Sequence, residues 1–246
     1  MKIIKTYLLA ITLLSMIIGL TSCSKCAKKV GDISEKNIQL NQFHSVRVTG
    51  NFAIKLVQDS SFTLKLTGGE GILENVEYEI VADTLRISNL NKCNFLSNYA
   101  KNITLEIGCG ELTKLAMSNP GSLENKTTLS SNDLLLEIRE CGIKMDLEGD
   151  FNKLSVLMDI GTPTLNLKGT TDELVINESS FGHIYAFGLI SKNTSIYSSG
   201  TGLININSTD FLKVQYNGSG IIRYRGTPAN VEIAIADNST AQVLED

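Results

Sequence analysis

Residues 154–162 read Leu-Ser-Val-Leu-Met-Asp-Ile-Gly-Thr, and this stretch decides the fold because its pattern returns about every 20 residues along the chain. Leu154, Val156 and Met158 stand at alternate positions, which is the spacing of a strand that buries one face. Glycine and threonine follow where the chain has to turn. The stretch therefore predicts one strand and one corner of a repeating unit.

Six rows of sequence align on this pattern. They start at Leu134, Leu154, Leu174, Thr194, Leu212 and Val231. Further along each row, glycine or a small polar residue recurs at one position, namely Gly142, Thr162, Gly182, Gly202, Gly220 and Ser239. A fixed period with apolar residues at matching offsets is typical of a solenoid, in which each turn buries its apolar side against its neighbours.

A parallel β-helix explains these rows better than a leucine-rich repeat does, because they lack the regular L-x-x-L-x-L motif. After the corner, Leu165 and Leu167 begin a second inward-facing strand, so each rung contains two strands. Glycines in the segments 199–202 and 217–220 are expected to adopt positive φ at the corner between the sheets. We therefore predict an all-β β-solenoid with rungs of about 20 residues.

The N-terminal half carries a more specific pattern. Residues 43–52 read FHSVRVTGNF, an alternating strand follows through Val57 and Gln58, and Thr84 to Ser88 form a later strand. With the Gly-Ser-Gly turns downstream, this pattern resembles the family of putative auto-transporter adhesins with a head GIN domain, over roughly residues 40–230. The resemblance implies a right-handed parallel β-helix in exported, often lipid-anchored proteins. We expect one domain over residues 40–246, with an N-terminal part at 40–108 and regular rungs at 109–246.

The first 22 residues have the order of a secretory signal. Lys2 and Lys5 precede an uncharged apolar run from Tyr7 to Leu20, and Thr21-Ser22 lead to Cys23. As a helix this run would reach about 21 Å, which is short of the ~30 Å hydrocarbon core of a bilayer. It is therefore interpreted as a signal peptide rather than a permanent membrane span.

Leu20-Thr21-Ser22-Cys23 resembles the bacterial lipobox, which implies cleavage before Cys23 and lipidation of its thiol. We expect two or three acyl chains to anchor the protein stably, whereas one chain binds only marginally. Residues 23–39 are interpreted as a lipidated, flexible tether. The predicted location is the cell envelope of a Gram-negative bacterium, in the outer membrane. The lysines after Cys23 leave the periplasmic and surface faces both open.

Net charge and cysteine content indicate which partners, disulfides and metal sites to expect. The formal net charge of −4 argues against nucleic acid as a partner. Besides Cys23, the cysteines are Cys26, Cys93, Cys109 and Cys141, which allow three pairings in an oxidising compartment. The pairing of Cys93 with Cys109 is favoured because it closes a hairpin-sized loop. The sequence has no H-x-E spacing, and its one C-x-x-C, Cys23-Ser24-Lys25-Cys26, contains the cysteine that is expected to be lipidated, so neither a metal nor a cofactor is expected.

Catalytic signatures are weak. Glycoside cleavage needs two carboxyl groups at a defined separation, and Asp159 and Glu178 are the nearest candidates on neighbouring rows. Their offsets differ by one, so they are expected to point to opposite sides of the sheet. Asp159 instead stacks on Arg139, which predicts a cross-strand ion pair. No G-x-S-x-G elbow is present, and we expect a protein that is not an enzyme.

Two surfaces are candidates for binding. The first is an outward-facing ladder that is more apolar than a solvated sheet needs, made of Glu137, Leu157, Asn177, Tyr197, Gln215 and Ala234. This ladder is either a docking face for a partner or a surface covered by other parts of the chain. The second site combines Tyr216 with Arg223, Tyr224 and Arg225 to hold a sugar or an acidic ligand. Its alternative is a stacked ladder with one tyrosine in the core.

These observations predict a lipid-anchored β-helix of the cell envelope that acts as a binding or scaffold module, with an adhesin role implied by the resemblance. The expected partners are the membrane, through Cys23, and a glycan or protein ligand. Self-association is a further possibility. The alternative function is a carbohydrate-active β-helix enzyme, either a polysaccharide lyase or a hydrolase.

Overall fold

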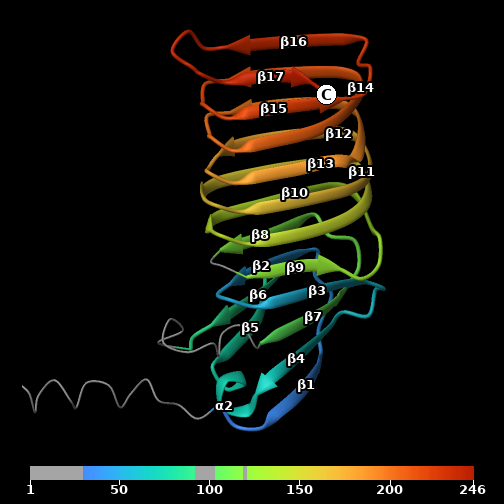
Figure 1. Cartoon of the computed structure of the whole chain (residues 1–246). Coiled ribbons are helices and arrows are strands. Elements are labelled where there is room, and N and C mark those ends of the chain that lie inside the picture. The colour runs from blue at the N-terminus through green and yellow to red at the C-terminus, as the bar shows by residue number, and fades with distance from the viewer. Residues whose placement is uncertain (1–29, 92–102, 119–120) are drawn as a thin grey trace, which may run out of the picture.

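The computed structural model describes residues 30–91, 103–118 and 121–246. Strands make up 70% of the structure and helix 2%, and the chain winds into a β-solenoid of about six turns. Figure 1 shows the strands stacked as rungs, with the C-terminus at one end of the stack. This architecture confirms the predicted fold class.

Five long strands form the regular rungs. They are β10 (Leu129–Cys141), β11 (Lys144–Gly161), β12 (Thr164–Ser179), β13 (His183–Ser198) and β14 (Leu203–Tyr216). Each pairs in parallel with the next, and Leu134, Leu154, Leu174, Thr194, Leu212 and Val231 stand in register across the rungs. The sequence rows therefore coincide with the structural rungs.

The strands of the rungs belong to one continuous 17-stranded sheet, which bends at the corners into two faces that are called here the first and the second sheet. The first sheet contains β10, the second halves of β11–β14, and β5 (Val76–Val81), β6 (Thr84–Asn89), β2 (Ser45–Thr49), β8 (Lys114–Ser118) and β16 (Asn230–Ile235). The second sheet contains the first halves of β11–β14 with β1 (Ile33–Gln39), β4 (Thr63–Gly69), β7 (Thr104–Cys109), β3 (Ala53–Gln58), β9 (Ser122–Asn125), β15 (Ile221–Arg225) and β17 (Gln242–Glu245).

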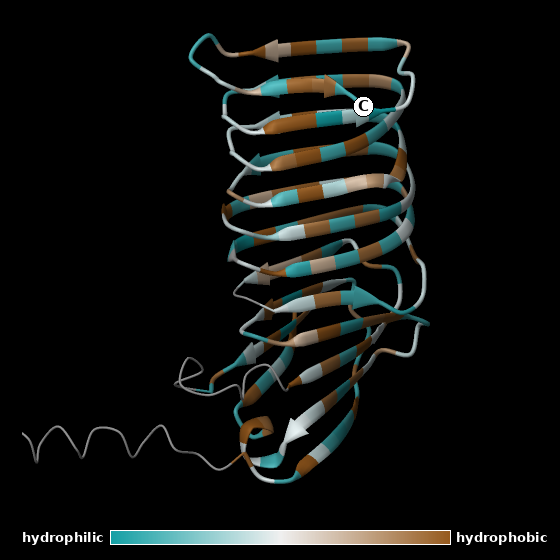
Figure 2. Cartoon of the chain, viewed as in Figure 1, coloured by the Kyte–Doolittle hydropathy of each residue, from teal (hydrophilic) through white to brown (hydrophobic). Residues whose placement is uncertain are grey.

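The core lies between these two sheets. Hydrophobic and hydrophilic residues alternate along the strands, as Figure 2 shows. Leu154, Val156 and Met158 are fully buried from the first sheet, and Leu165 and Leu167 from the second. Burying one such side chain stabilises the fold by about 1.5–3 kcal/mol, so the repeated inward columns supply the main driving force for stacking.

The N-terminal end departs from the regular parallel rungs. β2 lies between β6 and β8, and β3 lies between β7 and β9, so the order of rungs differs from the order of the chain. β4 and β5 pair antiparallel with β7 and β6, and α2 (Glu70–Leu73) is a single helical turn that follows β4.

The predicted tether is too long. Residues 33–39 form β1, which pairs antiparallel with the whole of β4, so this segment belongs to the folded domain. Ile38 lies opposite Leu64 and packs against the core, which explains why the segment is ordered despite its polar composition. Val30 also packs against the core, and residues 23–29 of the tether and the signal peptide lie outside the described residues.

The corner glycines are required for a different reason than predicted. Gly200, Gly202, Gly218 and Gly220 do not have positive φ, so the expected left-handed corner is wrong. A Cβ atom on Gly202 would instead overlap the carbonyl oxygen of Gly182 on the rung beneath. The same overlap with the rung beneath recurs at Gly218 and Gly220. Close backbone stacking, rather than conformational freedom, therefore demands glycine at this corner.

Of the two cysteines in the predicted disulfide, only Cys109 lies within the described residues. Cys109 is a free, buried thiol in the described structure, and burial raises its pKa to about 12. Its predicted partner, Cys93, lies outside the described residues, as do Cys23 and Cys26, so this pairing stays a prediction. Within the described ranges, no cluster of metal-ligating side chains occurs. No helix in those ranges is long and apolar enough to span a membrane.

Candidate functional site

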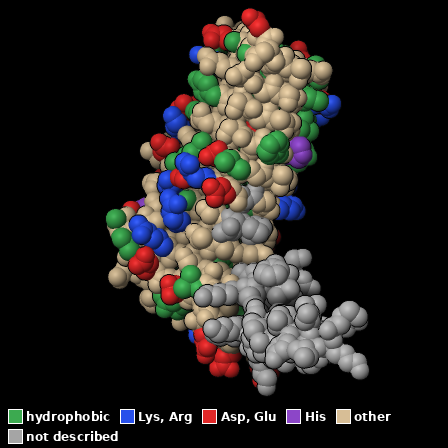
Figure 3. All heavy atoms as spheres, turned by 90° about the vertical axis from the view of Figure 1, so that its left-hand side faces the viewer, with side chains coloured by type: hydrophobic (Ala, Val, Ile, Leu, Met, Phe, Trp, Pro, Cys, Tyr) green, Lys and Arg blue, Asp and Glu red, His purple; other side chains and the backbone are tan. Residues whose placement is uncertain are grey.

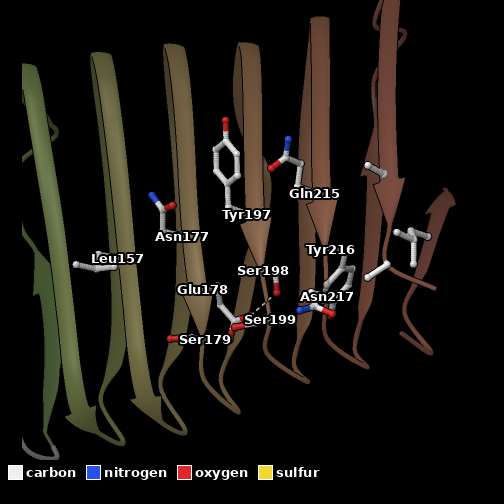
Figure 4. A pocket seen from close by; sticks show the side chains of 13 residues that line it. Leu157, Asn177, Glu178, Ser179, Tyr197, Ser198, Ser199, Gln215, Tyr216 and Asn217 are labelled. Atoms are coloured by element: carbon white, nitrogen blue, oxygen red, sulfur yellow. Dashed lines mark hydrogen bonds between the residues drawn. The ribbon is translucent and has the colours of Figure 1, made fainter. Parts of the chain in front are cut away.

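A shallow groove of about 640 Å³ lies on the first sheet, toward the C-terminal end of the solenoid. Figure 4 shows its side chains on the ends of successive strands. The residues that line it are Leu157, Asn177, Glu178, Ser179, Tyr197, Ser198, Ser199, Gln215, Tyr216, Asn217, Ala234, Ile235 and Ala236. Five of the six residues that the sequence placed on the outward ladder therefore line the groove, and Glu137 does not.

The outward ladder has the predicted register. Glu137, Leu157, Asn177, Tyr197, Gln215 and Ala234 follow one another across neighbouring strands. Tyr197 keeps 38% of its surface exposed, so no other described part of the chain covers the centre of the ladder. The alternative in which other strands bury this face does not hold for the described structure.

Tyr197 projects from β13 between two amide side chains, Asn177 on β12 and Gln215 on β14 (Figure 4). Both amides are exposed and make no hydrogen bond to another described residue. Each amide offers two donors and one acceptor, and the tyrosine ring offers an apolar face with a polar tip. The arrangement suits a ligand that has both apolar faces and hydroxyl groups.

A buried carboxylate lies beneath the groove. Glu178 is in register with Met158, so its side chain faces inward and is only 3% exposed. Its Oε1 accepts hydrogen bonds from the Ser180 amide at 2.7 Å and the Ser180 hydroxyl at 2.8 Å, and its Oε2 accepts one from Ser198 at 2.7 Å. A Cβ atom on Gly200 would overlap both carboxylate oxygens, so glycine leaves the space for them.

Glu178 was considered as a catalytic group from the sequence, but its buried role was missed. The sequence pattern that could have revealed its burial is its position at an inward offset, which Ile138 and Met158 occupy on the earlier rungs. The hydrogen bonds from serine side chains compensate for burial of this carboxylate, which explains how a charged residue occupies a core position.

The expected separation of Asp159 from Glu178 is confirmed. Asp159 is in register with Ser179 on the outward side, whereas Glu178 faces inward. Asp159 Oδ2 lies 3.5 Å from Arg139 Nη1, as the stacking prediction requires, and Ser179 donates a hydrogen bond to Asp159. Glu178 is the sole carboxylate among the described residues that line the groove. This arrangement does not provide the facing carboxylate pair of a glycosidase.

Ion pairs occur on the surface midway along the solenoid. Lys and Arg side chains lie beside Asp and Glu side chains there in the view of Figure 3. At the start of the outward ladder, Glu137 forms ion pairs with Lys114 and with Arg139, whose Nε lies 2.7 Å from Glu137 Oε1. The Lys114 and Arg139 hydrogen bonds lower the pKa of Glu137 although burial opposes them.

Glu137→Gln is expected to destabilise the fold at pH 7 by about 1–2 kcal/mol, because Lys114 and Arg139 lose their charged acceptor. The native pKa of Glu137 is lowered, so this stabilisation is present above the unfolded-state pKa and is lost as pH falls through the native value. In urea denaturation the deficit of the variant relative to the wild type should therefore be larger at pH 7 than at pH 3. Glu124→Gln, which removes an exposed 4.0 Å pair with Lys55, is the control and should change stability little at either pH. An equal deficit at both pH values would contradict this assignment.

The second predicted site is not assembled. Tyr216 is buried in the core at the end of the first sheet, and Tyr224 on β15 faces inward and packs against that core. Arg223 and Arg225 project from the second sheet toward Asp246, and the Arg225 guanidinium lies 4.0 Å above the Phe187 ring. Of the five predicted binding residues, Tyr197 and Tyr216 line the groove and the other three do not.

Comparisons with known proteins agree with this architecture. Residues 42–228 match the family described as "Putative auto-transporter adhesin, head GIN domain". None of the curated proteins compared matches the chain.

Three solved structures have a similar fold. A "putative adhesin" from Bacteroides fragilis is 19% identical, with a TM-score of 0.73, and the match covers 87% of this chain and 97% of that chain. A "putative lipid binding protein" from Parabacteroides distasonis is 17% identical, with a TM-score of 0.63 and coverage of 88% and 97%. A "putative adhesin" from Parabacteroides merdae is 19% identical, with a TM-score of 0.56 and coverage of 88% and 97%.

Proposed function

Because this chain belongs to the family of putative auto-transporter adhesins with a head GIN domain, we propose that it is a non-enzymatic binding module of the cell envelope. Its ligand contacts the groove on the first sheet. The single observation that carries this proposal is Tyr197, which is 38% exposed between the free amides of Asn177 and Gln215. An exposed aromatic ring between amides favours a glycan, because sugar rings present apolar C–H faces and hydroxyl groups together.

Tyr197→Ala is expected to weaken glycan binding by about tenfold or more, because a central aromatic anchor carries much of the energy of a binding surface. The full chain is screened on a glycan array, and the affinity for any bound glycan is then measured by titration calorimetry. Tyr185→Ala is the matched control. Tyr185 is also on β13 and also 38% exposed, but it lies on the second sheet, so its loss should leave affinity unchanged.

Three results would contradict this function. Equal losses of glycan affinity in Tyr197→Ala and Tyr185→Ala would show that the ligand does not bind in the groove. If the groove binds lipids and no glycans, its ligand would be of the kind named in the description of the Parabacteroides distasonis protein, "putative lipid binding protein". Turnover of a bound glycan that disappears when Asp159 and Glu178 are both changed to alanine would favour the carbohydrate-active enzyme instead.

Membrane attachment is the second part of the proposal. Cleavage before Cys23 and acylation of its thiol would place the solenoid on an outer membrane, with the segment between Cys23 and Val30 as the tether, because Val30 already packs against the core. The acyl chains supply attachment, since each buried methylene contributes ~0.8 kcal/mol. The solenoid then presents its groove without itself entering the bilayer.

The C-terminal end of the solenoid supports self-association. In the described structure β16 pairs only with β14, so its outer edge has unpaired backbone groups. Ile233 is in register with the buried Val214 and faces inward, yet it is 44% exposed because no further rung covers it. An open strand edge is a template for pairing, and antiparallel pairing of two β16 strands would give a symmetric dimer.

Ile233→Lys is expected to shift the full chain from dimer to monomer in sedimentation experiments, because the interface would then bury an unpaired charge. Ile190→Lys places the same charge at a position that is 49% exposed on β13 and should leave the oligomeric state unchanged. A monomeric wild type at all concentrations would contradict the dimer.

A further inference from the structure

Two arginines stand next to each other on the first sheet, at the opposite end from the groove. Arg47 on β2 is in parallel register with Arg86 on β6, and both residues lie on the outward side. Like charges directly opposite one another on neighbouring strands destabilise a sheet. The pair therefore carries an electrostatic cost that a bound anion would remove.

Arg47 has no carboxylate partner among the described residues. Its neighbour on the other side is Ala116 on β8, which has no charge to offer. Arg86 has one weak contact, with its Nη1 3.8 Å from Glu79 Oε1. The exposed Arg47 guanidinium thus keeps its fixed fork of N–H donors available.

Further donors lie beside the two guanidinium groups. Thr49 and Ser88 are in register two residues along the same strands, and both line a cavity of about 530 Å³ with Arg47 and Arg86. Two carboxylates also line this cavity. They belong to Glu79 and Glu77 on β5, which are in register with Arg86 and Ser88 and lie on the side of β6 away from Arg47, so Arg47 is the arginine whose charge is not offset. Guanidinium forks bind carboxylates through two parallel hydrogen bonds, and hydroxyl groups add single ones.

The arginine pair belongs to the same ladder as the groove. From Arg47 the register runs through Ala116, Glu137, Leu157 and Asn177 to Tyr197. These five steps of ~4.8 Å separate Arg47 from Tyr197 by about 24 Å along the sheet. Glu137 is the one carboxylate on this path, and its charge is compensated by Lys114 and Arg139. Ala116 and Glu137 are only 3% and 8% exposed, so an extended ligand that contacts both ends of the ladder has to pass over the side chains that cover these two positions.

We propose that Arg47 and Arg86 form an anion-binding subsite, and that the ligand of this face is an acidic polysaccharide. One of its carboxylates binds at the two guanidinium groups, while another part of the same chain lies against Tyr197. This inference rests on the function proposed for the groove. A polysaccharide is favoured over an acidic peptide because the other end of the ladder presents an aromatic ring and amides without a cation.

The test compares two oligosaccharide probes of equal length, each longer than about 24 Å. One probe is an oligogalacturonate and the other a neutral hexose oligomer, and calorimetry measures the affinity of the full chain for each. Arg47→Gln is expected to weaken oligogalacturonate binding about tenfold and to leave neutral binding unchanged, because one charge-assisted pair is lost. Arg223→Gln, on the second sheet, is the matched control for charge and should change neither affinity.

The outcomes separate this inference from the proposed function. If both probes bind and Arg47→Gln changes neither, the anion subsite is wrong and the groove function stands. If neither probe binds, the groove function fails with it. Arg47-dependent binding of polyglutamate as tight as that of oligogalacturonate would overturn the choice of a polysaccharide. Arg47→Gln should melt no lower than the wild type because it relieves repulsion, and a lower melting temperature would overturn that premise.

Discussion

Gly202→Ala is expected to destabilise the solenoid by about 3 kcal/mol and to lower its melting temperature by roughly 6–12 °C. The added Cβ would overlap the Gly182 carbonyl oxygen of the rung beneath. Backbone atoms cannot move aside as a flexible side chain can, so two rungs would have to separate locally. Because each rung is stabilised mainly by its neighbours, the loss of one contact weakens the whole stack.

The chain supplies a matched control at the same row position. Gly142 also stands at the corner of its row, yet a Cβ there would meet only the Thr162 hydroxyl oxygen, at 3.4 Å. Neither glycine has positive φ, so alanine can adopt the backbone dihedral angles of both positions. The two variants therefore differ only in what the added Cβ contacts. Gly142→Ala should change stability by less than about 1 kcal/mol in thermal and urea denaturation. Similar losses at both sites would contradict carbonyl stacking as the reason for glycine at Gly202.

Cys23→Ser is expected to abolish lipid attachment. Acylation needs the thiol, which serine lacks, so metabolic labelling with a fatty-acid analogue should mark the wild type and leave the variant unmarked. In the proposed anchor, the membrane affinity would come from the buried methylenes of the acyl chains, and the charged tether alone would give no stable attachment.

Cys26→Ser is the control for this experiment, because it removes a nearby thiol outside the lipobox-like segment. The control variant should keep its label. Label that persists in Cys23→Ser, or that disappears in Cys26→Ser, would assign the anchor to a different residue. Mass spectrometry of the N-terminal peptide would then identify the acylated cysteine.

Within the regular rungs, the sequence was enough to predict much of the candidate site. Each rung repeats the same alternation, so the row alignment placed Tyr197 between Asn177 and Gln215 and Asp159 beside Arg139, as the register confirms. Such predictions succeed because a stacked strand has one neighbour at a fixed offset on each side. The same rule correctly separated Asp159 from Glu178.

The binding residues predicted near the C-terminus illustrate where this reasoning stops. Tyr216, Arg223 and Arg225 are close in sequence, but a corner of the rung separates β14 from β15 and directs them to different sheets. Tyr216 is at an inward offset and is buried, whereas Arg223 and Arg225 face Asp246. Proximity along the chain is a poor guide wherever a corner intervenes.

The sequence by itself determined the solenoid, its period and the faces of its regular rungs, because alternation and spacing are local properties that each rung repeats. Only the tertiary structure decided the order of the N-terminal strands, in which β2 lies between β6 and β8 and so brings Arg47 next to Arg86. It also decided that Ile33–Gln39 joins the sheet. The need for glycine at the corners is likewise tertiary, because a Cβ atom there would overlap a carbonyl oxygen of the rung beneath. These features depend on contacts between segments far apart in the chain, and no local pattern in the sequence encodes them.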